Sequence, residues 1–105
     1  MTVEHAVKQI TAIAKGPGLL VREFVFAPGE ATAWHRHSQV TDLTYGLEGR
    51  TTLEMRGPDE TVQIGPGERR TLPPGRVHRL VNLGNEDARV LLIQHGGSYD
   101  FVEAG

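Results

Sequence analysis

The sequence predicts an all-β protein, either a sandwich or a barrel of short strands. Thirteen glycines and six prolines interrupt the 105 residues at short intervals. The segments between these turn residues have β character, and some of them alternate apolar and polar side chains. Short strands at regular spacing, with turn signals between them, are typical of β-sandwiches and β-barrels.

Eight strands follow from this pattern, in chain order. The segment Thr51–Arg56 places Leu53 and Met55 on one face, because successive side chains of a strand point to opposite faces. The run Val90–Ile93 is apolar on both faces, which predicts a strand in the middle of a sheet. The expected strands are Leu19–Ala27, Thr32–His37, Thr41–Leu47, Thr51–Arg56, Glu60–Ile64, Arg69–Leu72, Val77–Asn82 and Ala88–Gln94.

The N-terminal segment Glu4–Ala14 is ambiguous. Its apolar residues have roughly helical spacing, but the segment is also compatible with an edge strand that pairs with a second subunit. The chain has no internal repeat and no linker, so residues 1–105 are expected to form a single domain.

Two histidines lie two residues apart, at His35 and His37. Residues i and i+2 of a strand point to the same face, at about 6–7 Å between their backbone positions. Two imidazoles on one face are a common beginning of a metal site. The chain has no cysteine, so any metal must be held by histidine and oxygen ligands.

Two longer motifs surround these histidines and a third one, His78. Residues 29–49 read glycine, five residues, His-x-His, four residues, Asp42, six residues and glycine. Residues 67–82 read glycine, five residues, Pro-x-Gly, two residues, His78, three residues and asparagine. Together these motifs resemble the two motifs of the cupin superfamily, in which the first carries glutamate where this chain has Asp42.

The resemblance implies a double-stranded β-helix, or jelly-roll, cupin barrel that binds one metal inside its mouth. The ligands implied are His35, His37 and His78, with Asp42 as a fourth candidate. Imidazoles with at most one carboxylate suit a divalent transition metal, namely Fe, Mn, Ni, Co, Cu or Zn, rather than Mg or Ca.

Asp42 is the departure that matters, because its side chain is one methylene shorter than glutamate. If the backbone lies where a glutamate ligand needs it, the Asp42 carboxylate falls short of the metal by about 1.5 Å. Asp42 is then expected to bind the metal through a water, while direct ligation stays open. Gln39 is an alternative oxygen donor.

Further candidates lie near the C-terminus. Alternation on the last predicted strand places either Gln94 or His95 inward, but not both. Residues 96–102 begin with two glycines, after which Tyr99 either folds back across the barrel mouth or belongs to a strand that pairs with the sheet. This tail resembles, loosely, that of small cupins which open the ring of unsaturated uronates. The candidate proton-transfer residues are therefore Asp42, His95 and Tyr99.

Composition excludes several classes. The 11 basic and 13 acidic residues give a net charge of −2 with no basic block, so nucleic-acid binding has no electrostatic support. No run approaches a membrane span, and the first residues do not form a signal peptide, so a cytoplasmic protein is expected. A homodimer is expected, with the segment Val3–Ile13 as the candidate contact.

The fold itself leaves the function open, because cupins include enzymes, binding modules and storage proteins. The first hypothesis is a metal-dependent enzyme acting on a small polar molecule. Its branches are a lyase or isomerase of a sugar acid or dicarbonyl, and a three-histidine iron dioxygenase. The alternative is a non-catalytic cupin that binds or senses a small ligand.

Overall fold

The computed structural model describes residues 7–105, and these form ten strands in two antiparallel sheets. No helix among the described residues has the length and apolar content of a membrane-spanning segment. The strands are β1 (Gln9–Gly16), β2 (Leu19–Phe26), β3 (His35–Arg36), β4 (Thr41–Glu48), β5 (Thr51–Met55), β6 (Glu60–Ile64), β7 (Arg69–Leu72), β8 (His78–Val81), β9 (Ala88–His95) and β10 (Val102–Glu103).

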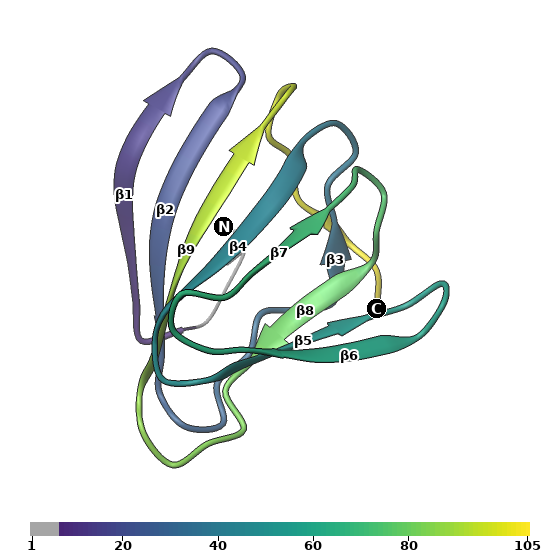
Figure 1. Ribbon diagram of the computed structural model, residues 1–105. Helices are drawn as coiled ribbons and strands as arrows, with labels where there is room; N and C mark the ends of the chain where they lie inside the picture. Colours follow the sequence, from purple (N-terminus) through teal and green to yellow (C-terminus); the bar gives the residue numbers. More distant parts are fainter. Residues whose placement is uncertain (1–6) are drawn as a thin grey trace.

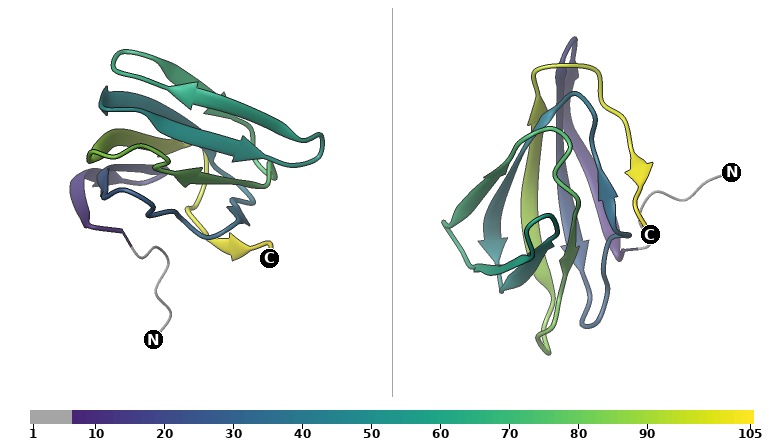
Figure 2. Two further views of the ribbon diagram at one scale, coloured as in Figure 1. Left: turned by 90° about the horizontal axis from the view of Figure 1, so that it is seen from below. Right: turned by 90° about the vertical axis from the view of Figure 1, so that its right-hand side faces the viewer.

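The two sheets form the walls of a flattened barrel (Figures 1 and 2). One has the order β1-β2-β9-β4-β7 and the other has the order β10-β3-β8-β5-β6. The core between them contains Phe24, Phe26 and Leu53, each fully buried. Burial of such a side chain contributes about 1.5–3 kcal/mol to the hydrophobic stabilisation of the fold. The predicted all-β, two-sheet fold is confirmed.

Seven of the eight predicted strands are present with ends shifted by at most one residue, and β9 is central as expected, between β2 and β4. The eighth prediction, a continuous strand over Thr32–His37, is wrong, because only His35–Arg36 forms regular ladder pairs there. The Oγ1 of Thr32 accepts a hydrogen bond from Leu80 N at 3.0 Å. Thr32 N also donates to Leu80 O at 2.9 Å, so Thr32 still pairs with Leu80, but one of the two bonds goes to its side chain instead of its carbonyl. Ala33 and Trp34 then lie outside the ladder.

The ambiguous N-terminal segment forms an edge strand where it is described. Strand β1 pairs with β2 on one side only, and all eight of its residues are exposed. The helical alternative for Glu4–Ala14 is therefore wrong over residues 9–14. Residues 1–6, which include Val3 and Glu4 of the expected dimer contact, lie outside the described residues.

The side chain of Asn82 forms hydrogen bonds with backbone groups of two chain segments, near Phe26 and near Glu86. Its Nδ2 donates to Phe26 O at 3.0 Å and to Glu86 O at 2.8 Å, and its Oδ1 accepts from Gly84 N at 2.9 Å. The side chain is 1% exposed, so every one of these bonds replaces water. Asn82 therefore satisfies backbone groups just after the end of β8.

Candidate metal centre

Three histidine side chains converge inside the barrel, two from β3 and its C-terminal end and one from β8. His35 and His78 lie directly opposite each other in the antiparallel pair of β3 and β8. The ring centroid of His35 lies 4.9 Å from the ring centroid of His37 and 4.4 Å from that of His78. All three side chains are 2–3% exposed, and one ring nitrogen from each lies within 4.8 Å of the other two.

The Nδ1 atom of every ring contacts a backbone carbonyl oxygen. His35 Nδ1 lies 2.7 Å from Ala33 O, His37 Nδ1 lies 2.6 Å from Asp100 O, and His78 Nδ1 lies 2.8 Å from Arg76 O. A carbonyl oxygen only accepts hydrogen bonds, so each Nδ1 donates the proton. In a neutral ring this leaves Nε2 with its lone pair, which is the form that binds a metal.

Asp42 reaches the same centre from β4. Its Oδ2 lies 3.2 Å from His37 Nε2 and 3.7 Å from His78 Nε2, and Gln94 Nε2 donates to Oδ2 at 3.2 Å. Burial raises the pKa of Asp42, but the close imidazoles of His37 and His78 outweigh burial and hold the pKa below its usual range. Asp42 is therefore ionised in the folded protein.

The pKa of His37 shifts in the opposite direction. Burial lowers the pKa of His37, but the interactions with the Asp42 carboxylate and the Asp100 carbonyl outweigh it, so the pKa is raised above its ordinary value of 6.5. Two of the buried polar atoms without a hydrogen-bond partner among the described residues belong to this centre, namely His37 Nε2 and Asp42 Oδ1. His37 Nε2 lies 3.2 Å from the Asp42 carboxylate, within ion-pair distance, without forming a hydrogen bond.

This donor set fits a metal ion. Lone pairs of imidazole nitrogens and a carboxylate converge in a space without water contact, and such an arrangement requires a cation, which is either a proton or a metal. The ligand atoms within 4.8 Å of one another belong to the three histidines, and the Asp42 carboxylate lies beside this group rather than in it. Three imidazoles with a neighbouring carboxylate are a ligand set for a transition metal.

A second layer of polar residues orients Asp42. Arg22 Nη2 donates to Gln94 Oε1 at 3.3 Å, which turns the amide nitrogen of Gln94 toward Asp42. The guanidinium of Arg22 also lies 4.9 Å from the ring centroid of Tyr99. From the sequence, Gln94 was expected only as an alternative to His95 and Arg22 was not expected at this site, because nothing in the chain order brings β2 and β9 together.

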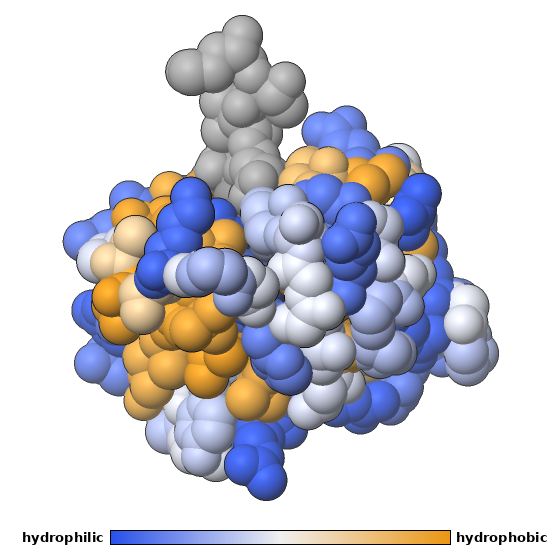
Figure 3. Space-filling view, turned by 90° about the horizontal axis from the view of Figure 1, so that it is seen from above, coloured by the Kyte–Doolittle hydropathy of each residue, from blue (hydrophilic) through white to orange (hydrophobic). Residues whose placement is uncertain are grey.

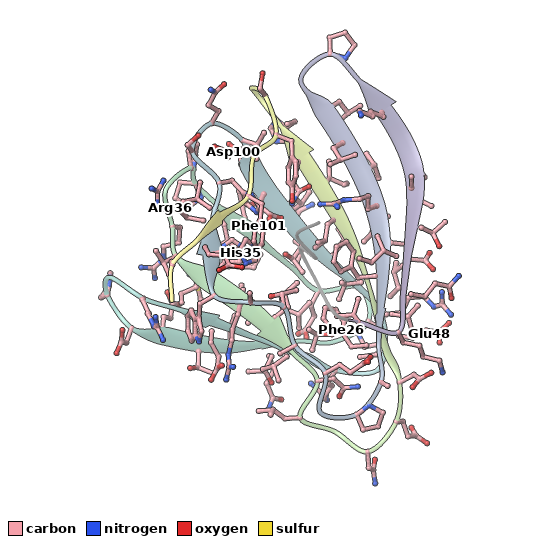
Figure 4. The ribbon with its side chains drawn as sticks, turned by 180° about the vertical axis from the view of Figure 1, so that it is seen from behind. Phe26, His35, Arg36, Glu48, Asp100 and Phe101 are labelled. Carbon is pink, nitrogen blue, oxygen red and sulfur yellow. The ribbon has the colours of Figure 1, made fainter. Side chains whose placement is uncertain are left out.

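The C-terminal tail folds back over the histidines and also pairs with β3, so both alternatives considered for it occur together. Phe101 stacks on His35 at 4.8 Å between ring centroids, and Tyr99 lies against His37 at 5.3 Å. Strand β10 pairs with β3 at Val102↔Arg36. Viewed from behind, Phe101 lies over His35, while Arg36 points away from the cluster (Figure 4).

A cavity of about 310 Å³ opens beside the cluster, at the end of the barrel where the β1–β2 turn and the start of the tail meet. Leu19, Leu20 and Val40 form its apolar side, and Gln94 and Tyr99 are among its polar lining. Gln94 contacts Asp42 and Tyr99 contacts His37, so these two residues line the cavity on the side of the histidine cluster. The volume is at the lower end of the range for small-molecule sites, about 300–1,000 Å³.

The structure brings together His35, His37, His78, Asp42 and Tyr99, and it leaves His95 apart. Of the two candidates on β9, Gln94 is buried, whereas His95 is exposed on the other face. Gln39 also points away from the centre, because its Oε1 accepts a hydrogen bond from Ser98 N at 3.2 Å.

Comparison with known proteins agrees with this architecture. The sequence pattern of the cupin domain matches residues 22–94. Glucose-6-phosphate isomerase of Thermococcus kodakarensis is 33% identical over 73 residues, which cover 67% of this chain and 37% of that enzyme. An uncharacterized protein of Methanocaldococcus jannaschii is 28% identical over 79 residues, which cover 75% of this chain and 62% of that protein. The chain thus spans less than two thirds of the length of these relatives.

Solved structures share the fold. An uncharacterized protein with a double-stranded β-helix domain from Klebsiella pneumoniae superposes with a TM-score of 0.80 at 21% identity, covering 90% of this chain and 81% of that one. KdgF from Halomonas superposes with a TM-score of 0.76 at 23% identity, covering 86% and 79%. An oxalate oxidase in complex with glycolate superposes with a TM-score of 0.75 at 20% identity, covering 82% and 46%. The two-sheet barrel, the two motifs and the family match together establish that this chain belongs to the cupin domain family.

Proposed function

We propose that this chain is a metal-dependent cupin enzyme that acts on a small polar molecule. His35, His37 and His78 hold one divalent transition metal, which when bound supplies a Lewis acid or activates dioxygen. The observation that carries the proposal is the set of three buried imidazoles whose Nδ1 atoms are all occupied by carbonyl oxygens. This arrangement leaves three Nε2 atoms for one ion.

In this proposal Asp42 acts beside the metal, through a water rather than as a direct ligand. Its carboxylate lies outside the group of histidine nitrogens, as expected for a side chain one methylene shorter than glutamate. Oδ2 is engaged by Gln94, whereas Oδ1 has no hydrogen-bond partner in the described structure and is free to accept a proton. His95 has no role in this proposal, because it is exposed on the outer face of β9.

The cavity next to the cluster is the proposed substrate site. Its apolar side suits a small carbon skeleton, while Gln94 and Tyr99 offer an amide and a phenol to polar groups of the substrate. Sugar acids, β-dicarbonyls, glucose 6-phosphate and oxalate are the compounds to test first. The first two follow from the metal chemistry, and the last two follow from the names of the related isomerase and oxidase.

A first experiment measures the metal content of protein expressed without added metal or a histidine tag, by elemental mass spectrometry. We expect close to one equivalent of Fe, Mn, Ni, Co, Cu or Zn in the wild type, and loss of that metal in His78→Ala. The matched control is His95→Ala, which removes an exposed histidine and keeps the metal. Wild type without metal after reconstitution, or His78→Ala with the wild-type content, would falsify the metal site.

A non-catalytic binding cupin is the second candidate, favoured by the 2–3% exposure of the histidines beneath the tail. The two candidates differ in turnover. Metal-loaded protein is incubated with each test compound, and products are followed by nuclear magnetic resonance. Conversion that disappears in His78→Ala supports the enzyme, whereas saturable binding without any product supports the binding cupin.

A further inference from the structure

We propose that the C-terminal segment Tyr99–Ala104 holds two ligands of the metal centre in position. Asp100 is the positioning residue for His37, and Phe101 is the positioning residue for His35. Metal binding and docking of this segment then stabilise each other. The inference rests on the proposed metal site and adds the way in which that site is held in shape.

His37 is the ligand that depends on the tail. His35 and His78 donate to carbonyl oxygens of Ala33 and Arg76, each only two residues earlier in the chain. His37 instead donates to Asp100 O at 2.6 Å, across 63 residues of sequence. The orientation and tautomer of His35 and His78 are therefore set by neighbouring residues in the chain. Those of His37 are set only while the tail is docked.

The Asp100 carbonyl is held in place from the same loop that carries His37. Ser38 N donates to Asp100 Oδ1 at 2.7 Å, and Ser38 Oγ hydrogen-bonds to Asp100 Oδ2. Asp100 thus contacts two successive residues, His37 through its main chain and Ser38 through its side chain. Bonds to an ionised carboxylate are stronger than neutral ones, so this clamp is suited to fixing one carbonyl oxygen.

Phe101 acts on His35 in a different way. The two rings stack at 4.8 Å between centroids with an interplanar angle of 25°. The main chain continues the contact, because Glu103 pairs with His35 and Ala104 N donates to Trp34 O at 2.9 Å. His35 therefore lies between β8 on one side and β10 on the other. Stacking restricts the rotation of its ring, and strand pairing restricts its backbone (Figure 4).

Thermodynamic linkage requires that this coupling is reciprocal. If the docked tail improves the geometry for the metal, the metal must stabilise the docked tail by the same factor. Loss of a partner that orients a metal-bound histidine typically weakens metal affinity by about 10–100-fold. Effects of that size are expected for the positioning residues, without loss of the fold.

The experiment uses full-length protein and Co²⁺ as the probe. Affinity is measured by isothermal titration calorimetry, and ligand geometry by the visible absorption of the bound Co²⁺. The variants are Asp100→Ala and Phe101→Ala, with Asp100→Asn as the conservative variant that keeps an oxygen to accept from Ser38. Glu103→Ala is the matched control, because this exposed side chain belongs to the same segment and its position pairs through the backbone. Melting of the metal-free proteins reports whether each variant folds.

We expect Asp100→Ala and Phe101→Ala to weaken Co²⁺ binding about 10-fold or more and to change the absorption spectrum. Asp100→Asn is expected to recover part of the loss, and Glu103→Ala to stay within about twofold of wild type. In wild type, amide hydrogen exchange of residues 98–104 should slow on addition of Co²⁺. If one variant fails to fold, the other variant and the exchange measurement decide the question.

Folded variants with wild-type affinity and spectrum, or tail exchange that Co²⁺ leaves unchanged, would overturn the coupling while the three-histidine site stands. Wild type that binds no Co²⁺ would overturn the metal site itself. The two failures are therefore distinguishable in the same set of measurements.

Discussion

At the scale of single residues, the centre is defined by where protons are held. Carbonyl oxygens occupy the Nδ1 atoms of all three histidines, so the Nε2 atoms face an ionised Asp42 with lone pairs of their own. A proton on His37 resolves this conflict in the metal-free protein, and in the proposed function a metal ion takes the place of that proton. The raised pKa of His37 and the lowered pKa of Asp42 describe the same interaction from its two sides.

This interaction makes the stability of the metal-free protein depend on pH. The pKa of His37 is raised above 6.5, so its contribution is fully present below pH 6.5 and is lost as pH rises through the raised value. The pKa of Asp42 is lowered from 3.8, so its contribution is present above pH 3.8 and is lost as pH falls through the lowered value. Both contributions are present between pH 3.8 and 6.5.

We therefore expect the free energy of unfolding in urea, measured with chelator present, to decrease as pH rises above 6.5. Asp42→Asn removes the charge that raises the pKa of His37 and should flatten this decrease. His95→Ala lies outside the centre and should retain it. A wild-type stability that rises through this range, or an unchanged slope in Asp42→Asn, contradicts the assignment of the ion pair.

At the scale of elements, strand β4 positions the centre at one end and makes a close backbone approach at the other. Alternation buries Asp42 and Thr44 on the inner face, as the sequence predicts. At Gly46 the backbone of the 65–68 turn comes close, since Gly46 N donates to Glu68 O at 2.8 Å. An added Cβ at Gly46 would lie 2.0 Å from Gly65 O, so this position requires glycine.

Gly46→Ala is accordingly expected to lower the free energy of unfolding by about 1–3 kcal/mol, the usual cost of overpacking. A domain of this size has about 5–15 kcal/mol of stability, so the effect is readily measured by urea unfolding. Gly16→Ala is the control, because an added Cβ there has no atom within 4 Å, and it should stay within about 0.5 kcal/mol of wild type. Equal stabilities of the two variants would mean that the 65–68 turn moves aside without cost.

At the scale of the whole molecule, one edge of the barrel is open. Within residues 7–105, strand β1 has a partner on one side only and is exposed along its length, with Ile10 at 40% and Ile13 at 55%. Seen from above, a large apolar area lies at the left of the molecule and a smaller one at the upper right, with more hydrophilic residues between them (Figure 3). An open edge with exposed apolar side chains is a common site of pairing between chains.

The expected homodimer is tested by light scattering coupled to gel filtration at micromolar concentration. The chain has a mass of 11.5 kDa, so a dimer has twice that mass. Ile13→Lys places a charge on the β1 edge and should shift the protein toward monomer. Leu83→Lys changes a side chain that is 70% exposed in the loop between β8 and β9, and it should leave the oligomeric state unchanged. A monomeric wild type removes the prediction.

The sequence by itself determined the strands and the three histidines, because both depend on short-range order. Strands are set by alternation between glycine and proline turns, and the histidines by two motifs with fixed spacing. The sequence also indicated that Asp42 is one methylene shorter than glutamate, which favours binding through a water and leaves direct ligation open, since side-chain length is a local property. The same local reasoning failed at Thr32–His37, where Leu80, distant in the sequence, donates to the Thr32 side chain and the ladder is absent at Ala33 and Trp34.

Only the tertiary structure decided which residues surround the centre. The pairing of β9 with β2 and β4 selects Gln94 over His95, and the docking of the tail brings Asp100 to His37 across 63 residues. Arg22 reaches Gln94 across 72 residues in the same way. Contacts of this kind depend on strand register and on loop closure, which no local pattern of side chains encodes.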